Sequence, residues 1–215
     1  MAQTEIRVFL ADDHAMVREG LAALVSGDSE IKVVGHCGDG LEVVEQVARL
    51  QPDVVLLDIT MPGLNGLDVC RELSRRFTNI AILMLTMHDD EQFIAKALEN
   101  GASGYLVKEA AAGQLREAVR TVAQGELFLS PGISKNVLQL IARRGDDPHD
   151  TLTSRERQVL QLIAEGKTNR QIADQLQLAI KTVDTHRSNL MRKLNIHDQT
   201  SLVKYALRRG IVHLT

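Results

Sequence analysis

The apolar run Val54-Val55-Leu56-Leu57 ends in Asp58, and the same pattern of an apolar run followed by a polar side chain recurs along the first half of the chain. The other runs are Ile6 to Ala11, ending in Asp12-Asp13; Ile80 to Leu85, ending in Thr86; and Tyr105 to Val107, ending in Lys108. Short Val/Ile/Leu runs separated by amphipathic stretches are typical of buried parallel strands joined by crossover helices. Ligand sites of open parallel sheets lie beyond the carboxyl ends of the strands, so we expect these five polar side chains to converge.

Strands and helices alternate through residues 5–124. The predicted strands cover 6–11, 31–37, 53–57, 80–85 and 104–107. Such alternation indicates a parallel sheet covered by helices on both faces. We predict an α/β fold with a flavodoxin-like, doubly wound, five-stranded parallel sheet of order 2-1-3-4-5. This order places the first and third strands side by side, so that Asp12, Asp13 and Asp58 lie together.

The second half of the chain has helical signals throughout. Thr153 and Glu156 form one capping box and Thr168 and Gln171 another, and two further helices are expected over 180–194 and 198–210. Two short helices followed by a longer polar one are typical of a helix-turn-helix. We predict domains over 1–125 and 151–215, the second an all-α four-helix domain, joined by a linker over 126–150 that holds a short helix beginning at Ser130-Pro131.

Charge and cysteine content restrict the class of protein. The net charge of −3 combines +6 from Thr151 onward, where 11 Lys+Arg face 5 Asp+Glu, with −9 before it. A basic domain behind an acidic one indicates an anionic partner for the second half. Cys37 and Cys70 lie among apolar residues without metal-type spacing, so we expect core positions. The N-terminus lacks an apolar signal core and no apolar stretch approaches the roughly 20 residues that span a bilayer, so we predict a soluble cytoplasmic protein with no membrane partner.

The converging side chains suit phosphoryl chemistry. Three neighbouring carboxylates favour a hard cation, and Mg²⁺ accepts carboxylate oxygens while leaving a position for a phosphoryl oxygen. Asp58 can then act as a nucleophile that forms an acyl phosphate, with Lys108 supplying positive charge and Thr86 a hydroxyl donor. The alternative, solvated loop residues, fits each of them singly but not the set. The chain has no Walker-type glycine cradle and no Asp-x-Asp motif, which weakens a reading as a nucleotide-consuming enzyme or phosphatase.

Four motifs of the first half match the receiver pattern. They are Asp12-Asp13-His14, Leu57-Asp58-Ile-Thr-Met61-Pro62-Gly-Leu-Asn-Gly66, Leu85-Thr86-Met-His88 and Gly101-Ala-Ser-Gly-Tyr105-Leu-Val-Lys108. Through them the chain resembles a bacterial two-component response regulator over residues 5–124. The resemblance implies that Asp58 is the phosphoacceptor and that Asp13 is a direct Mg²⁺ ligand. It also implies that Asp12 binds the metal mostly through water and that the backbone carbonyl of Thr60 completes the metal shell.

The resemblance also implies a conformational switch. The Thr86 hydroxyl would turn toward the phosphate and the Tyr105 ring would move into the vacated space. Alternatively, Tyr105 is an ordinary half-buried strand aromatic. His14 and His88 flank the site, but the chemistry requires neither as a catalyst or ligand. We expect replacement of His88 to change the dephosphorylation rate without abolishing phosphorylation.

The second half matches a different pattern. Its motifs are Leu152-Thr-Ser-Arg-Glu156-Arg-Gln-Val-Leu160, Ile163-Ala-Glu-Gly166, Thr168-Asn169-Arg-Gln-Ile172-Ala173, Lys181-Thr182-Val183-Asp-Thr-His186 and Arg192-Lys193-Leu194. They resemble the LuxR/FixJ-type helix-turn-helix domain from Leu152 to Val212. Together with the receiver motifs they imply the NarL/FixJ subfamily of response regulators.

A recognition helix over 180–194 would bury Val183, Leu190 and Leu194. By position in the motif, the expected base readers are Asp184, Thr185 and Ser188. The expected phosphate contacts are Asn169, Lys181, Thr182, Arg187 and Lys193.

Two features of this helix leave alternatives open. The Asp184 carboxylate could accept a hydrogen bond from a cytosine amine or serve as a first-turn acid favoured by the helix dipole. Leu178-Ala179-Ile180 offers no Ser or Thr N-cap, so the start of the helix is expected to fray or to be ordered by DNA.

The combined pattern predicts a transcription regulator whose DNA affinity is set by phosphorylation of Asp58 by a sensor histidine kinase. The expected partners are promoter DNA, a second copy of the chain and RNA polymerase. Leu202, Val203 and Ala206 are candidates either for dimer contacts or for plain core. The competing hypotheses are a helix-turn-helix regulator that works without phosphorylation and a magnesium phosphotransferase or phosphatase. We expect the chain not to be a turnover enzyme.

Overall fold

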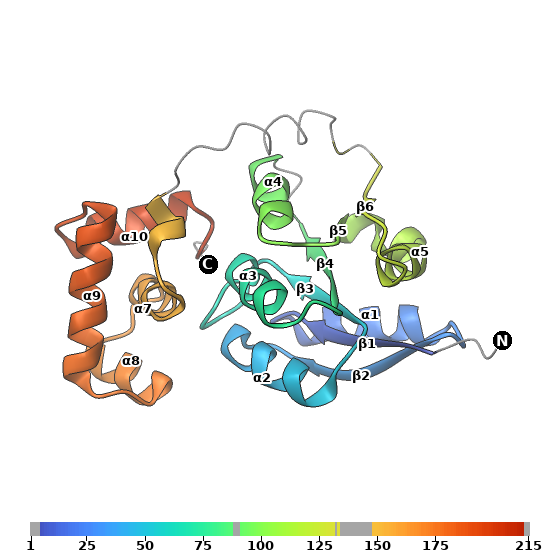
Figure 1. Cartoon of the computed structure of the whole chain (residues 1–215), viewed down its shortest axis with the longest axis horizontal. Helices are drawn as coiled ribbons and strands as arrows, with labels where there is room; N and C mark the ends of the chain where they lie inside the picture. Colours follow the sequence, from blue (N-terminus) through green and yellow to red (C-terminus); the bar gives the residue numbers. More distant parts are fainter. Residues whose placement is uncertain (1–4, 88–90, 132, 134–147, 213–215) are drawn as a thin grey trace. The chain divides into compact units, whose positions relative to one another are not determined.

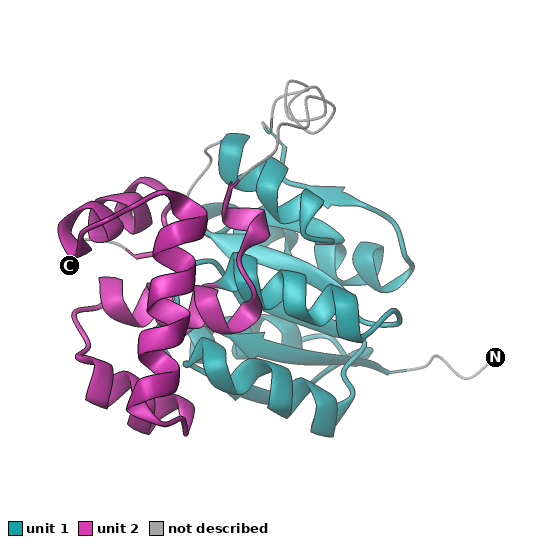
Figure 2. Cartoon of the chain, turned by 60° about the vertical axis from the view of Figure 1, so that its left-hand side comes forward, with its two compact units in different colours: residues 1–62, 66–144 teal, residues 63–65, 145–215 magenta. Residues whose placement is uncertain are grey.

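The computed structural model describes residues 5–87, 91–131, 133 and 148–212. The chain separates into two compact units, residues 1–62 with 66–144 and residues 63–65 with 145–215 (Figure 2). Each unit is described by itself. Within the described part of the chain, no helix has the length and apolar character needed to cross a membrane.

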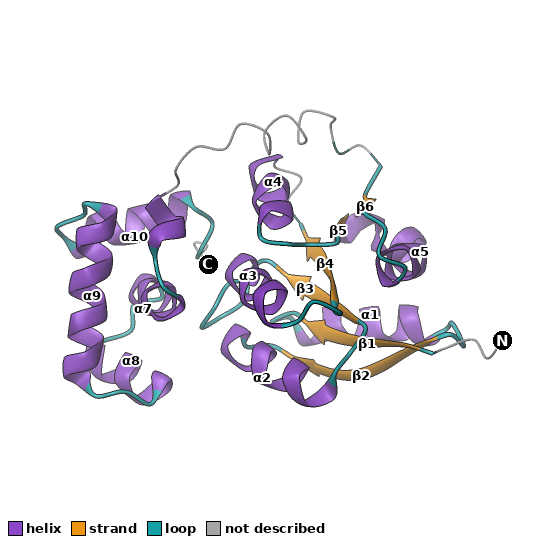
Figure 3. Ribbon diagram, in the orientation of Figure 1, coloured by secondary structure: helices purple, strands orange, loops and turns teal. Residues whose placement is uncertain are grey.

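The first unit is built on a parallel sheet of six strands in the order β2-β1-β3-β4-β5-β6 (Figure 3). The strands are β1 Ile6–Ala11, β2 Ile31–Cys37, β3 Val54–Asp58, β4 Ala81–Thr86, β5 Gly104–Val107 and β6 Phe128–Leu129. The predicted 2-1-3-4-5 order of the first five is confirmed. The count of five is wrong, because Phe128 pairs with Gly104 and adds a sixth strand. A strand of two residues is too short to produce a periodic apolar pattern.

Helices cover both faces of this sheet (Figures 1 and 3). They are α1 Ala15–Ser26, α2 Gly40–Leu50, α3 Gly66–Arg76, α4 Glu91–Glu99 and α5 Ala111–Ala123, with a short 3-10 helix η1 Lys108–Ala110. Leu21 of α1 and Leu115 of α5 share one buried cluster with Val8, Leu56 and Leu85 of the strands. α2 packs beside α3 and α3 beside α4, which completes the doubly wound arrangement.

The central strand β3 lies between β1 and β4, and all five of its residues are buried. Ala11 pairs with Leu57, and Asp58 pairs with Leu85. Asp58 is the last residue of β3 and Thr86 the last residue of β4, whereas the predicted strands ended at residues 57 and 85. The strand order and register bring the carboxyl ends of β1, β3 and β4 to one edge of the sheet.

Both cysteines are free and buried, as expected for core positions. Burial raises the pKa of the Cys37 thiol to about 11 and that of Cys70 to about 12. Cys70 is fully buried on α3.

The second unit is helical, as predicted. Its elements are the 3-10 helix η2 Pro148–Thr151 and the helices α7 Ser154–Ala164, α8 Asn169–Leu176, α9 Ile180–Leu194 and α10 Gln199–Arg208. Both predicted capping boxes are present, at Thr153 with Glu156 and at Thr168 with Gln171. α9 packs against α7 and α8, and α10 packs against α7.

The burial of individual side chains tests the predicted buried residues of α9 and the two alternatives for α10. Val183 and Leu190 are fully buried and Leu194 is half-buried. Leu202 and Ala206 are fully buried core residues, whereas Val203 is partly exposed. The predicted short helix after Ser130 and the middle of the predicted linker, 134–147, lie outside the described residues.

Candidate functional site

The carboxyl ends of β1 and β3 place two buried carboxylates around one ammonium group. Lys108 Nζ lies 2.7 Å from Asp12 Oδ2 and 2.8 Å from Asp58 Oδ2. The Asp12, Asp58 and Lys108 side chains are 1%, 6% and 11% exposed. Lys108 begins η1 directly after β5, so three separate segments of the sheet edge supply the cluster. The predicted convergence of these residues is confirmed.

The turn after β3 requires a glycine. The Gly66 N–H donates to the Ile59 carbonyl at 2.7 Å, which folds the start of α3 back over the end of β3. A Cβ at Gly66 would lie 1.8 Å from the carbonyl oxygen of Asp58, far inside the contact limit. The Ile59 N–H in turn donates to Asp58 Oδ1 at 2.8 Å. Backbone geometry therefore orients the carboxylate.

Burial and ion pairing have opposite effects on the pKa values of Asp58 and Lys108. Burial raises the pKa of Asp58, and the nearby Asp12 charge raises it further, although Lys108 and the Ile59 N–H oppose both effects. Burial alone would lower the pKa of Lys108, but the Asp58 and Asp12 carboxylates outweigh it and raise the pKa. Lys108 is accordingly a fixed positive charge, and Asp58 is a carboxylate of increased basicity.

The opening of this cluster carries two more ligand-type side chains, Asp13 and His14. One ligand atom from each of Asp12, Asp13, His14 and Asp58 lies within 4.8 Å of the others. His14 Nδ1 is 2.7 Å from Asp13 Oδ1 and 3.6 Å from Asp12 Oδ1. Three carboxylates in this space fit a hard divalent cation such as Mg²⁺. The proximity of His14 follows from its adjacency to Asp13 in the sequence.

The other described receiver residues lie on β4 and β5 or just after β3. Thr86 ends β4 and is 1% exposed, and Tyr105 of β5 is fully buried. The alternative of a half-buried Tyr105 is therefore wrong, because the side chain is fully buried, and the switch role stays a prediction. Thr60 is half-buried two residues after Asp58. His88 lies outside the described residues.

Seven of the eight predicted DNA-contact residues lie on α9, and the eighth, Asn169, is the partly buried first residue of α8. Lys181, Asp184, Thr185 and Ser188 are exposed, while Thr182, Arg187 and Lys193 are partly buried. The Thr185 hydroxyl donates to the Lys181 carbonyl and the Ser188 hydroxyl to the Asp184 carbonyl, each at 2.9 Å. α9 has no acidic residue in its first turn, so the first-turn role considered for Asp184 is wrong. Ala179 provides no side-chain cap, which confirms the missing N-cap.

Lys193 is held by its own domain. Its Nζ lies 2.6 Å from Glu156 Oε2 and donates to the Thr151 carbonyl at 2.9 Å. Burial alone would raise the pKa of Glu156, but hydrogen bonds from Lys193 and from the Thr153 N–H outweigh it and lower the pKa. Sequence reasoning did not anticipate this pairing, because the partners are 37 residues apart.

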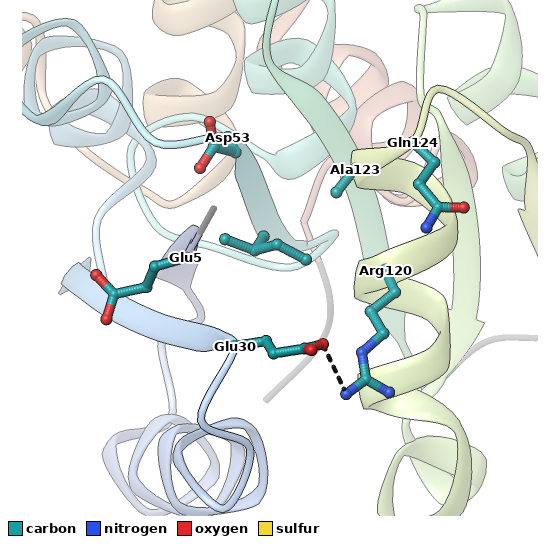
Figure 4. A pocket seen from close by; sticks show the side chains of 7 residues that line it. Glu5, Glu30, Asp53, Arg120, Ala123 and Gln124 are labelled. Atoms are coloured by element: carbon teal, nitrogen blue, oxygen red, sulfur yellow. Dashed lines mark ion pairs between the residues drawn. The ribbon is translucent and has the colours of Figure 1, made fainter. Parts of the chain in front are cut away.

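A pocket of about 380 Å³ lies at the opposite, amino-terminal edge of the sheet (Figure 4). Glu5, Glu30 and Asp53 line it with Arg120 of α5. The Arg120 guanidinium lies 3.2 Å from Glu30 Oε2 and also pairs with Asp28. These contacts neutralise part of the acidic lining and tie α5 to the loop before β2. They do not form part of the Asp58 cluster.

Comparison with known proteins agrees with this geometry. The family model for the response regulator receiver domain matches residues 8–120, and the model for bacterial regulatory proteins of the luxR family matches 150–206. The transcriptional regulatory protein LiaR of Bacillus subtilis is 39% identical over 210 residues, which covers 97% of this chain and all of LiaR.

Solved structures are similar to this chain over nearly its whole length. The crystal structure of ChrA, a response regulator of a heme-sensing two-component system, is 33% identical with a TM-score of 0.53, over 97% of this chain and 99% of ChrA. A structure of two RcsB dimers bound to two parallel DNAs is 26% identical with a TM-score of 0.60, over 94% of this chain and 98% of RcsB. The chain therefore belongs to the NarL/FixJ family of two-component response regulators and is a DNA-binding transcription regulator with a receiver domain and a LuxR-type helix-turn-helix domain.

Proposed function

We propose that Asp58 accepts a phosphoryl group from a sensor histidine kinase in an Mg²⁺-dependent reaction and that this modification controls promoter binding. The observation that carries the proposal is the buried Asp58 carboxylate held 2.8 Å from Lys108 at the edge of the sheet. Its pKa is raised by burial, which favours nucleophilic attack by increasing basicity. The chain would act as an acceptor that is modified and then restored, and not as a turnover enzyme.

In the proposed transfer, an oxygen of Asp58 forms a bond to phosphorus while the bond between phosphorus and the kinase histidine nitrogen breaks. The electron pair of that bond stays on the imidazole nitrogen, and the product is an acyl phosphate. Lys108 compensates the negative charge of the transferred group, and the Thr86 hydroxyl donates to one of its oxygens. When bound by Asp12, Asp13, Asp58 and the Thr60 carbonyl, Mg²⁺ would reduce the repulsion between the carboxylate and the incoming phosphate.

The switch between inactive and active receiver would involve two buried side chains. Once Thr86 turns toward the phosphate, the space that it leaves becomes available to the ring of Tyr105. Both residues are buried, so the change requires repacking inside the domain and favours two discrete arrangements over a gradual one.

The DNA-binding proposal rests on α9. We propose that α9 enters the major groove, with Asp184, Thr185 and Ser188 facing base edges. Asn169, Lys181, Thr182, Arg187 and Lys193 are proposed phosphate contacts. The net charge of +6 from Thr151 onward supports attraction to DNA.

The same domain would bind as a homodimer to an inverted repeat. A solved structure of two RcsB dimers bound to two parallel DNAs supports binding as a dimer by family likeness. Because Leu202 and Ala206 are fully buried, the proposed contact on α10 is restricted to Val203 and its exposed neighbours. We propose RNA polymerase as a further partner and the cytoplasm as the place of action, since promoter DNA is there.

The experiment is intact mass measurement, with size-exclusion chromatography on the same samples, after incubation with Mg²⁺ and acetyl phosphate. We expect one phosphoryl group on wild type, none on Asp58→Asn, and a shift toward dimer that accompanies the adduct. Asp53→Asn is the matched control, since Asp53 precedes the same strand at the opposite edge of the sheet. Absence of an adduct on wild type, even with a phosphoramidate donor, would favour a regulator that works without phosphorylation.

A further inference from the structure

A chain of side-chain hydrogen bonds runs from Asp184 of α9 through Asn169 of α8 and Arg187 of α9 to Gln199 of α10. Asn169 Nδ2 donates to Asp184 Oδ1 at 2.6 Å, and Arg187 Nη1 donates to Asn169 Oδ1 at 3.3 Å. The other terminal nitrogen of Arg187, Nη2, donates to Gln199 Oε1 at 3.1 Å. Asn169 is the first residue of α8 and Gln199 the first of α10. The Asp184 carboxylate is therefore bonded directly to α8 and linked to α10 through Asn169 and Arg187.

This arrangement distinguishes Asp184 from its neighbours on the exposed side of α9. Thr185 and Ser188 bond their hydroxyls to carbonyls of their own helix, an arrangement that any exposed helix can offer. Asp184 is bonded to a residue 15 positions away on α8. Its carboxylate is therefore oriented by the tertiary structure of the domain and not by α9 alone.

The bond from Asn169 occupies one oxygen of the Asp184 carboxylate and leaves the other for a ligand. Oδ1 of Asp184 accepts from Asn169, whereas Oδ2 receives no hydrogen bond from any described residue. In the major groove, a carboxylate recognises the exocyclic amine of cytosine as a hydrogen-bond donor. Guanine and thymine present acceptors in place of that amine, so a fixed carboxylate discriminates against them. A carboxylate free to rotate would discriminate less well.

We propose that Asn169, Arg187 and Gln199 are positioning residues that hold the Asp184 carboxylate for a cytosine amine at one position of each operator half-site. The proposal rests on the proposed entry of α9 into the major groove. It gives Asn169 and Arg187 a role through Asp184 in addition to the phosphate contacts proposed above, and the two roles have different signatures. A phosphate contact strengthens binding to every sequence and steepens the salt dependence, whereas a positioning residue changes base preference.

The test uses the full chain and a library of short DNA duplexes with a randomised central segment, selected by binding and read by sequencing. The variants are Asp184→Ala, Asn169→Ala, Gln199→Ala, Arg187→Lys and the double variant Asn169→Ala with Asp184→Ala. Arg192→Lys is the matched control for Arg187→Lys. Arg192 lies on the same helix, but its Nη2 bonds to Asn189 of α9 itself.

We expect Asp184→Ala to reduce the preference for cytosine at one half-site position by roughly tenfold. Asn169→Ala, Gln199→Ala and Arg187→Lys should reduce the preference at that same position, and the double variant should lose no more than Asp184→Ala alone. For Gln199→Ala, which removes none of the proposed phosphate contacts, binding to DNA without a selected site, and its salt dependence, should stay at the wild-type level. Arg192→Lys should keep the full preference.

Three results would count against the proposal, and they are distinguishable. If Asp184→Ala alters the preference but Asn169→Ala and Gln199→Ala do not, Asp184 reads DNA without positioning, and the proposed function survives. If Asp184→Ala leaves the preference unchanged, the proposed placement of α9 fails together with the positioning role. An affinity loss for Asn169→Ala that is uniform across sequences, with a shallower salt dependence, would assign Asn169 to a phosphate.

Discussion

The receiver site and the exposed side of α9 place their functional side chains by different means. In the receiver, strand order and register bring Asp12, Asp58 and Lys108 together, and the backbone N–H of Ile59 orients the acceptor carboxylate. On α9, Asn169 of α8 bonds Asp184 directly, and Gln199 of α10 is linked to Asp184 through Arg187 and Asn169. The first arrangement depends on the fold of the main chain, and the second depends on a few hydrogen bonds between side chains. We therefore expect substitutions in the receiver site to cost more stability than substitutions around α9.

The largest effect is expected for Gly66→Ala. The new Cβ would collide with the Asp58 carbonyl, which is backbone and cannot move aside without shifting the end of β3. We expect a loss of more than about 3 kcal/mol in unfolding free energy, together with loss of phosphorylation. The measurements are chemical denaturation followed by circular dichroism and intact mass after acetyl phosphate treatment.

Gly113→Ala is the control for this substitution. Gly113 lies within α5, and a Cβ there meets nothing within 4 Å. It should raise stability by about 0.5 to 1 kcal/mol, since alanine favours the helix. If Gly66→Ala and Gly113→Ala had equal unfolding free energies, the turn after β3 would be able to accommodate a Cβ. The receiver site would then depend less on its main-chain fold than we expect.

Lys108→Met removes the cation between two buried carboxylates. We expect a loss of about 3 kcal/mol at neutral pH, because Asp12 and Asp58 would then repel each other without compensation. Without Lys108 the pKa of Asp58 rises further, so its folded value lies above its unfolded value. A raised carboxylate pKa gives stability that is present below the unfolded pKa and lost as pH rises through the folded pKa.

The deficit of Lys108→Met relative to wild type should therefore shrink toward acidic pH. Denaturation curves of both proteins at neutral pH and at about pH 4.5 measure this change. A deficit independent of pH would contradict an electrostatic role for Lys108 and point to lost packing of its side chain.

A smaller effect is expected for Lys193→Met in the second unit. Lys193 pairs with Glu156 and is partly exposed, so we expect a loss of about 1 to 2 kcal/mol at neutral pH. The lowered pKa of Glu156 gives stability that is present above its unfolded pKa and lost as pH falls through the folded value. The difference from wild type should therefore diminish below about pH 4, as measured by denaturation at neutral and acidic pH.

The DNA affinity of Lys193→Met distinguishes a structural role of Lys193 from a phosphate contact. If Lys193 acts as a structural partner of Glu156, salt dependence of DNA binding should match wild type once the domain is folded. A salt dependence reduced by about one phosphate contact would show that Lys193 leaves Glu156 on binding.

The smallest effect is expected for Ala179→Ser, which is stabilising. Ala179 has the extended N-cap conformation, φ −73° and ψ 145°, but its side chain accepts no hydrogen bond. A serine hydroxyl there can accept from the first turn of α9, and we expect a gain of about 0.5 to 1 kcal/mol by denaturation. Ala48→Ser on the exposed side of α2 is the control and should cost about 0.5 kcal/mol. No gain at position 179 would show that the start of α9 is already ordered.

The sequence predicted the parts that rest on local or repeated signals. Apolar runs ending in Asp58, Thr86 and Lys108 located the strand ends, because buried parallel strands have a strong apolar pattern. The capping boxes at Thr153 and Thr168 were predictable, since each consists of residues three positions apart. The order of the first five strands followed from the general rule for doubly wound sheets.

The unpredicted parts depend on packing between distant segments. β6 has two residues and is recognised through its pairing with β5. The full burial of Tyr105 depends on the elements that cover β5, and the bonds from Arg187 to Asn169 and Gln199 depend on how three helices meet. No pattern in one segment contains this information.

The burial of both cysteines has a practical consequence for studying motion in this protein. Cys37 and Cys70 are the two thiols of the chain, and their raised pKa values keep them protonated and slow to react at neutral pH. The wild-type chain can therefore serve as the background for site-specific labelling without prior cysteine removal. A cysteine introduced at Leu127, which is 53% exposed, would be modified far faster by a maleimide dye than either native thiol. Fluorescence from that position could then follow the receiver in real time as a phosphodonor is added.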